Sequence, residues 1–570
     1  MKFKQVMIII AMSIGIFLCM LDTTVMNVAL PAIQSSLRIQ LNNISWALNI
    51  YTILFASLTI PLGKIAEHFG THKSYILGFI VFISGSAISS FAHNLTMLII
   101  GRAVQSIGAA LVFPLSMSIG INSVDLSVRK QVIAVLGITQ GLAAALGPII
   151  GGCLTNFLSW RWIFIINIPL GIISVIICLY TLKLNEPTQP EAIDFVGSLL
   201  SMITLFSLTL GLVQGRVWGW HSSVIICLFM LSGISLLLFI ICEYKSSHPM
   251  MPLVLFKNRE FTGSAITILL SNLFLVAVTV VLPTYFVKIQ GKTELEAALL
   301  ITPITGMIFI FSPLAAILID KLGARIVIST GFILMTMSFI LFSIINMKNL
   351  FLVVITCMIL GTGYGIITGP ITVLAASDFK GSLLNASQSV AGVLRQIGIS
   401  LAIAVYVTGL YGNLVTAKNH SIQYIKNEVI ALNIPEEKKT TVIQKAIHSL
   451  SNTSTSTPKN HFTSVEKKRI IQENYYQVLK EQPSSISDVE KRQIHAQVSI
   501  KVNSKLKTIN QNTNAAIAKI KSFAVNEYGK AFTKLYRNSI IFVFLSTFVS
   551  FLFPKKKVKS KRKLHSAENA

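Results

Sequence analysis

Long apolar segments recur along the whole chain, and this feature constrains the fold more than any other. Fourteen of them approach the roughly 20 residues that cross a bilayer as a helix. They lie at residues 6–31, 46–65, 74–92, 95–119, 133–154, 161–182, 195–213, 222–242, 263–286, 297–319, 325–345, 350–375, 387–412 and 537–553. Only 12% of the residues are charged, about half the share in a soluble protein. The sequence therefore predicts an all-α, multi-pass membrane protein.

The basic residues indicate how the chain is oriented. An even number of spans puts both termini on one side, and Lys2, Lys4 and the basic tail 554–570 predict that this side is cytoplasmic, in a plasma (inner) membrane. Much of the net charge of +26 lies in the tail and in a polar insert at 413–536, which this topology places outside. The tail is expected to contact anionic membrane lipid. We expect no nucleic-acid partner, because the charge is not spread over the whole chain.

A weak internal repeat divides the spans into two halves. GKIAEHFGTHK, after the second span, resembles AILIDKLGARI at the end of the tenth, so that Glu67 aligns with Asp320 and Gly70 with Gly323. We expect a six-helix half at 1–182, two inserted helices at 195–242, and a second half formed by 263–412 and 537–553. Related halves are typical of transporters, in which the substrate site lies between them near the bilayer midplane.

An acidic residue, Asp22, lies deep in the first span, within LDTTVMNVALP. A carboxylate in hydrocarbon is costly, so Asp22 is either functional or held by polar neighbours in helix packing. Arg102, in LIIGRAVQSIGAAL of the fourth span, keeps its proton and needs an acceptor. At about 1.5 Å per residue, both residues lie roughly 10–13 Å from the outer ends of their spans and can meet. We expect Arg102 to hold Asp22 ionised in one state and release it in another; a static ion pair is the alternative.

Other polar residues in the spans are candidates for lining a substrate cavity. Arg395, in the thirteenth span, has no acid at a matching depth, so backbone carbonyls or the substrate are its expected partners. The candidate cavity residues are Thr23, Asn27, Gln105, Gln140 and Arg395.

Two further motifs involve small residues and a charged loop. The fifth span contains GITQGLAAALGPIIGG, whose small residues permit close helix packing; its glycines and proline of interest are Gly137, Gly141, Gly147, Pro148, Gly151 and Gly152. A generic packing face is the alternative interpretation. The loop GKIAEHFGTHK and its repeat supply the residues of a candidate cytoplasmic latch, in which a carboxylate and cations bridge helix ends: Gly63, Glu67, Gly70, Lys73, Asp320 and Arg325.

These motifs together resemble the major facilitator superfamily, in particular its fourteen-span drug:proton antiporters of the EmrB/QacA type. The resemblance covers the membrane part and excludes the insert. It implies that Asp22 is a proton-linked carboxylate, that the glycine-rich fifth span is the antiporter signature, and that a proton gradient rather than a bound cofactor drives transport. The chain departs from the family pattern at Glu67, where Asp is usual, and at Ser106, where Gly is usual.

Several other classes of protein lack support in the sequence. The chain has no GxxxxGK[ST] phosphate loop, no HExxH, no GxSxG and no CxxC, so we expect neither direct ATP drive, nor a hydrolase, nor a zinc site. The expected function is proton-coupled efflux of amphipathic compounds, cationic ones included, and not an enzymatic activity. Export of an endogenous lipid, siderophore or peptide is the alternative, and a non-transporting sensor or scaffold is a second one.

The insert at 413–536 is the part of the chain that the resemblance does not explain. It is polar and rich in Lys and Asn, and stretches such as TTVIQKAIHSL and VEKKRIIQENYYQVLK have the apolar spacing of amphipathic helices. An exterior helical appendage, disordered in part, is one interpretation. A module that binds an exterior partner or gates the substrate is the other.

Overall fold

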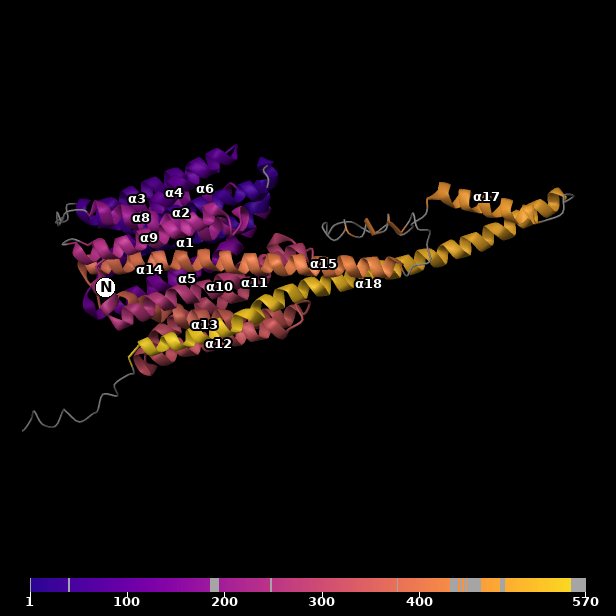
Figure 1. The fold of residues 1–570 in the computed structure, drawn as a ribbon. Helices are drawn as coiled ribbons and strands as arrows, with labels where there is room; N and C mark the ends of the chain where they lie inside the picture. Colours follow the sequence, from indigo (N-terminus) through magenta and orange to yellow (C-terminus); the bar gives the residue numbers. More distant parts are fainter. Residues whose placement is uncertain are drawn as a thin grey trace, which may run out of the picture. The chain divides into compact units, whose positions relative to one another are not determined.

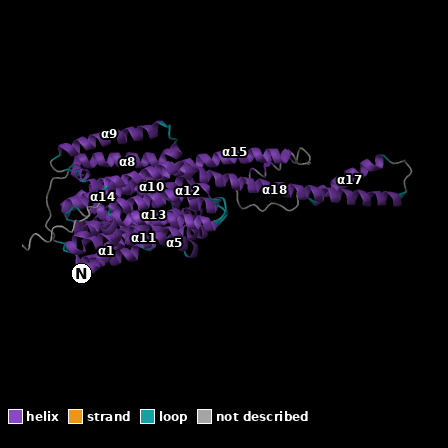
Figure 2. Cartoon of the chain, turned by 90° about the horizontal axis from the view of Figure 1, so that it is seen from below, coloured by secondary structure: helices purple, strands orange, loops and turns teal. Residues whose placement is uncertain are grey.

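Helix is the only regular secondary structure in the described part of the chain (Figure 2). The computed structural model describes residues 2–38, 41–184, 194–246, 249–376, 378–430, 463–481 and 487–554, together with residues 439, 440, 443, 444 and 447.

Figure 1 shows the helices of the chain, most of which coincide with the apolar segments, whereas most of α15, all of α17 and most of α18 lie in the polar insert. In chain order they are α1 (Phe3–Leu37), α2 (Leu41–Phe69), α3 (Thr71–Ser90), α4 (Leu95–Asn122), α5 (Leu126–Phe157), α6 (Trp162–Ile165), α7 (Asn167–Thr181), α8 (Phe195–Trp218), α9 (Ser223–Lys245), α10 (Arg259–Lys288), α11 (Glu294–Leu322), α12 (Ala324–Ile344), α13 (Leu350–Ala376), α14 (Gly381–Ala402), α15 (Thr408–Ile430), α17 (Ser464–Lys480) and α18 (Asp488–Ser546). Short 3-10 helices cover Leu253–Lys257 and Thr547–Leu552, and a π-helix covers Ile403–Val407.

The number of spans agrees with the sequence. Thirteen described helices are long and apolar enough to cross a membrane, and two pieces of α5, Gln131–Ala143 and Leu146–Phe157, meet at 44° and make a fourteenth span. The bend has a local cause, because Pro148 has no amide hydrogen for the carbonyl of Ala144 and its ring crowds that carbonyl. The predicted all-α multi-pass fold is therefore confirmed. The last span, predicted at 537–553, consists of the end of the longer helix α18 and the 3-10 helix Thr547–Leu552 that follows it.

The membrane helices belong to one compact unit, which comprises Met1–Val287, Lys292–Leu410 and Thr533–Ala570. Within it, α5 packs against α11 and α13, and α2 packs against α14. These contacts join the two halves that the repeat predicts. The inserted helices α8 and α9 pack on each other, with Thr204 donating a 2.9 Å hydrogen bond to Ser235, and α8 also contacts α2. Much of α9 has exposed apolar side chains, as expected of a helix that faces lipid.

A second unit comprises Lys288–Gly291 and Tyr411–Phe532, and so includes most of α15, all of α17 and most of α18. The rings of Tyr424 and Phe523 stack with centroids 4.0 Å apart, beside a buried cluster of Ile425, Val429 and Ile520. The predicted amphipathic stretch VEKKRIIQENYYQVLK is α17, whose Ile470 and Ile471 pack against Val502 and Leu506. Most of the other stretch, TTVIQKAIHSL, lies outside the described residues.

Candidate transport site

Asp22 on α1 and Arg102 on α4 form a buried ion pair. Nη1 of Arg102 donates a hydrogen bond to Oδ2 of Asp22, and neither residue is more than 1% exposed. Gln105 lies three residues after Arg102, on the same face of α4. Its Nε2 donates to Oδ1 of Asp22 over 2.9 Å, and its Oε1 accepts from Nη1 of Arg102 over 2.9 Å. The structure thus brings together the acid and the arginine that the sequence placed at similar depths.

Arg102 has two further kinds of partner. Its Nε donates to the carbonyl of Ala47 on α2 over 3.1 Å. Its guanidinium carbon lies 4.3 Å from the centre of the Tyr51 ring and 5.9 Å from that of Phe164. A guanidinium is attracted to the face of an aromatic ring, so these contacts add to the stabilisation that the carboxylate provides.

A close contact between α3 and α4 positions the amide of Gln105. A Cβ at Gly85 would lie 2.3 Å from the backbone nitrogen of Gln105, so only glycine permits this approach. The approach brings Oγ of Ser86 within 2.8 Å of Nε2 of Gln105, and Asn167 of α7 donates to the same oxygen over 3.2 Å. The groups around Asp22 and Arg102 therefore come from α2, α3, α4, α6 and α7.

The arrangement determines which group can change its charge. Two opposite charges in contact are neutral as a unit, which lowers the cost of placing them among apolar helices. An arginine side chain does not give up its proton, whereas a carboxylate can accept one. Asp22 is therefore the member of the pair that can titrate once water reaches it.

The glycines of α5 lie on two sides of the helix. On one side a Cβ at Gly147 would lie 1.9 Å from Oγ1 of Thr24, and one at Gly151 would lie 2.9 Å from the carbonyl of Val25, so α5 directly contacts α1 there. On the other side lie Gly137, which faces Thr372 of α13, Gly141, which faces Ile308 of α11, and Gly152, which faces Leu295 of α11. The fifth helix is thus packed closely against both halves.

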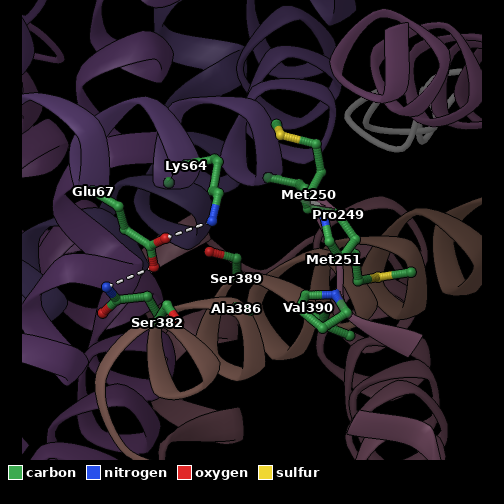
Figure 3. Close-up of a pocket in the computed structure, with 13 residues that line it drawn as sticks. Lys64, Glu67, Pro249, Met250, Met251, Ser382, Ala386, Ser389 and Val390 are labelled. Carbon is green, nitrogen blue, oxygen red and sulfur yellow. Dashed lines mark hydrogen bonds and ion pairs between the residues drawn. The ribbon is translucent and has the colours of Figure 1, made fainter. Parts of the chain in front are cut away.

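Glu67 joins α2 to α14 at the end of the bundle that is predicted to be cytoplasmic (Figure 3). It accepts a 2.8 Å hydrogen bond from Nδ2 of Asn385 and lies 3.2 Å from Nζ of Lys64. Ser118 of α4 donates to Oδ1 of the same Asn385. Nearby, a Cβ at Gly63 would lie 2.8 Å from Oγ of Ser389, so α2 and α14 are in close contact here.

The other residues of the candidate latch are placed differently. Gly70 adopts a φ of 103°, which favours glycine, at the turn between α2 and α3. Lys73 is exposed. Arg325 donates to the carbonyls of Phe551 and Phe553 over 3.0 and 3.1 Å, so it secures the end of the last span. The side chain of Asp320 lies outside the described residues.

Two contacts at this end were not predicted: the hydrogen bond from Asn385 to Glu67, and the one that Arg129 of α5 donates to the carbonyl of Phe379. Burial lowers the pKa of the Arg129 guanidinium. An asparagine in a stretch with other Ser and Asn residues does not stand out in the sequence. Its role as a link between helices depends on which helix lies opposite it in the fold.

A cavity of about 200 Å³ lies beside Glu67, between α2, α14 and residues 249–252 (Figure 3). Ile60, Lys64 and Ser389 are among its lining residues, with Met250 and Met251 on the third side. The backbone amides of both methionines donate to the buried carboxylate of Glu243 on α9, each over 3.1 Å. The segment after the inserted helices is thereby fixed at the boundary between α2 and α14.

The candidate cavity residues do not form one cluster around Asp22. Gln105 belongs to the Asp22 pair, whereas Thr23 donates a 2.7 Å hydrogen bond to the carbonyl of Met20. Gln140 is buried, and its Oε1 has no hydrogen-bond partner in the described part of the chain. Arg395 lies over the ring of Phe113. The side chain of Asn27 lies outside the described residues.

Comparison with known proteins identifies the family. Residues 12–403 match the family model described as Major Facilitator Superfamily. The chain belongs to this superfamily. Major facilitator proteins are transporters, so the chain is a transporter and not an enzyme.

Several curated major facilitator proteins are similar to it. The multidrug transporter protein MdtP of Bacillus subtilis is 30% identical over 420 residues, which cover 73% of this chain and 77% of MdtP. The multidrug export protein EmrB of Escherichia coli is 32% identical over 339 residues, 59% of this chain and 66% of EmrB. The riboflavin transporter RibZ of Clostridioides difficile is 28% identical over 434 residues, 75% of this chain and 93% of RibZ.

A solved major facilitator structure shares the fold. The human organic anion transporter MFSD10 superposes with a TM-score of 0.51 at 13% sequence identity, covering 72% of this chain and 93% of that one. The match of the family model to residues 12–403 confirms the resemblance to the superfamily that the sequence motifs indicated.

Proposed function

We propose that this transporter exports amphipathic compounds across the plasma membrane in exchange for protons, with Asp22 as the proton-binding group and with both termini in the cytoplasm. The observation that carries the proposal is the buried ion pair of Asp22 and Arg102, bridged by Gln105. The positive-inside distribution of Lys and Arg supports the orientation.

The pair supports coupling through a simple electrostatic cycle. While Asp22 is ionised, breaking its contact with Arg102 would leave two uncompensated charges among apolar helices. Protonation removes the negative charge and weakens the hold on Arg102. A cationic group of a substrate neutralises the acid in the same way, so substrate and proton compete for one carboxylate, and this competition is sufficient for exchange.

The cycle needs alternating access, in which contacts between the halves close one end of the bundle at a time. The bond between Glu67 and Asn385, the contact of Gly63 with Ser389 and the bond from Arg129 to Phe379 close the end of the bundle predicted to be cytoplasmic. A state that opens at this end must break them. Protonation and release of Asp22 would then favour one state over the other.

The names of the relatives support two classes of substrate. MdtP and EmrB are multidrug transporters, which favours export of varied amphipathic compounds. RibZ is a riboflavin transporter, which favours a second candidate function, the transport of a metabolite on the same scaffold.

The test is a substrate-induced pH change in proteoliposomes that contain the purified protein and a trapped pH indicator. Tetraphenylphosphonium, ethidium and riboflavin would be added outside one at a time. An exchanger moves the added substrate in and protons out, so we expect the internal pH to rise with at least one lipophilic compound. A response to riboflavin alone would favour the metabolite transporter. Uptake of a labelled compound with no pH change would contradict proton exchange.

A further inference from the structure

Among the Asp, Glu, Lys and Arg residues, three lie away from the ends of the predicted spans: Asp22, Arg102 and Arg395. Asp22 and Arg102 neutralise each other, so Arg395 is the one of the three without an opposite charge beside it. The spans of the second half offer it no partner, because 263–286, 297–319, 325–345, 350–375, 387–412 and 537–553 contain no Asp or Glu. The interior of the second half therefore has a net positive charge.

Arg395 lies where the two halves meet. Its guanidinium carbon is 5.5 Å from the centre of the Phe113 ring on α4. Gly392, one turn earlier on α14, faces the same ring, since a Cβ there would lie 3.3 Å from Phe113 and 3.9 Å from Thr59 of α2. The superfamily's architecture places the substrate between the halves, so Arg395 lies on the surface that a substrate would contact.

The charge of Arg395 is incompletely compensated by the protein. Its Nη1 is enclosed, yet no group of the described residues accepts a hydrogen bond from it. The Phe113 ring offsets a part of the cost of a partly buried cation, but it accepts no hydrogen bond in the plane of the guanidinium. A guanidinium remains charged and presents paired N–H groups that match a carboxylate, sulfonate or phosphate.

We propose that Arg395 binds an acidic group of the transported compound, so that the substrates include amphipathic anions or zwitterions, with the ring of Phe113 against the apolar body next to that group. The proposal rests on the proposed function and changes the charge expected of the cargo. Phe113 lies eleven residues after Arg102 on α4, or roughly 16 Å along the helix. The acidic group and the proton thus occupy separate places, and a zwitterion can present its cationic end to Asp22.

Three probes with the same fluorophore test the charge preference: dansylglycine, which is anionic, dansylglycinamide, which is neutral, and dansylamidoethyl-trimethylammonium, which is cationic. Binding to the purified full-length protein is measured by equilibrium dialysis, with empty detergent micelles as the blank. We expect Arg395→Gln to weaken binding of dansylglycine by about tenfold or more, because a hydrogen bond to a charged group is lost. Binding of dansylglycinamide should change less than twofold.

Two further variants separate recognition from folding. Arg395→Lys keeps the charge and should retain part of the affinity for dansylglycine. Arg161→Gln removes an arginine at the edge of a span, where it stacks on Trp160, and should leave the preference unchanged. Equal losses for the anionic and the neutral probe in Arg395→Gln would show that Arg395 is structural and would overturn the proposal. So would tighter binding of the neutral probe than of dansylglycine by the unmodified protein.

Transport of the same probes in proteoliposomes tests the proposed function separately. Proton-coupled uptake of the neutral or cationic probe with no binding of dansylglycine would leave the export function standing and refute the anion site. Selective binding of dansylglycine without any proton-coupled uptake would support the anion site and contradict proton exchange.

Discussion

Asn385 on α14 donates a 2.8 Å hydrogen bond to Glu67 on α2, and so links the two halves through one carboxylate. Ser118 on α4 donates to the same asparagine, which makes its amide the meeting point of three helices. Any state that opens the bundle at this end must break both bonds. One uncharged side chain therefore contributes two of the hydrogen bonds that stabilise the closed arrangement, beside the contact of Gly63 with Ser389 and the bond from Arg129 to Phe379.

Asn385→Ala should shift the transporter toward the state that opens at this end. A hydrogen bond to a charged acceptor contributes about 1.5–3 kcal/mol, so the population ratio should change by about tenfold or more. Spin labels at positions 183 and 380, in a background without the native cysteines, would report the distance between the halves. Ser382→Ala, which alters an exposed residue lining the same cavity, is the matched control. Identical distance distributions for both variants would rule out this role of Asn385.

Asp22→Asn should abolish proton-coupled transport while the protein still inserts into the membrane. Asparagine keeps the size of the side chain but does not take up a proton near neutral pH. The pH response in proteoliposomes should therefore disappear. Binding of a neutral substrate should remain. Normal proton exchange by this variant would contradict the role of Asp22.

The ion pair of Asp22 and Arg102 should also contribute to the stability of the fold. Arg102→Gln leaves Asp22 as an unpaired acid, and loss of one member of a buried pair typically destabilises a protein by about 3–5 kcal/mol. Combining Arg102→Gln with Asp22→Asn removes both charges and should recover much of the loss. Thermal unfolding of the purified variants checks this, and additive effects of the two substitutions would argue against direct coupling.

Gly147→Ala should impair folding or transport, because the added Cβ would lie 1.9 Å from Oγ1 of Thr24. Overpacking of this kind costs about 1–3 kcal/mol. Gly152→Ala is the control on the same helix, since its Cβ would meet Leu295 at an ordinary 3.5 Å. The melting temperatures and transport rates of the two variants should differ clearly. Equal behaviour would mean that α1 and α5 are not in close contact at Gly147.

Glu243→Ala should release the segment that follows α9. The carboxylate accepts from the amides of Met250 and Met251, so hydrogen exchange of these two amides should become about tenfold faster or more. Cys242→Ala, at the preceding residue, should leave their exchange unchanged. If exchange is equally slow in Glu243→Ala, other contacts must hold the segment. Slower transport by the variant would connect the inserted helices to opening of the cavity beside Glu67.

The sequence predicts the spans and the Asp22–Arg102 contact because both follow from distances along straight helices. The length of the apolar segments predicts the spans. The rise per residue of a helix places Asp22 and Arg102 at similar depths in the membrane. It does not predict that Glu67 bonds to Asn385, because that pairing depends on which helices of the two halves lie opposite each other. The role of Glu243 is hidden for a similar reason, since a carboxylate at a span end resembles a solvated one until the following segment folds back on it. The polar residues of α18 likewise concealed that the last span continues a longer helix.

The two glycine-bearing sides of α5 have a mechanical consequence. Helices usually interlock through ridges and grooves of side chains, and sliding one past another requires those side chains to change rotamer. At Gly147 and Gly151, α5 presents no side chain to α1. At Gly137 and Gly141, it presents none to α13 and α11. The two pieces of α5, on either side of the bend, therefore meet their neighbours with few side chains that a small shear motion would force into another rotamer. Alternation between the two states would then require few packing contacts to be rebuilt in this part of the bundle.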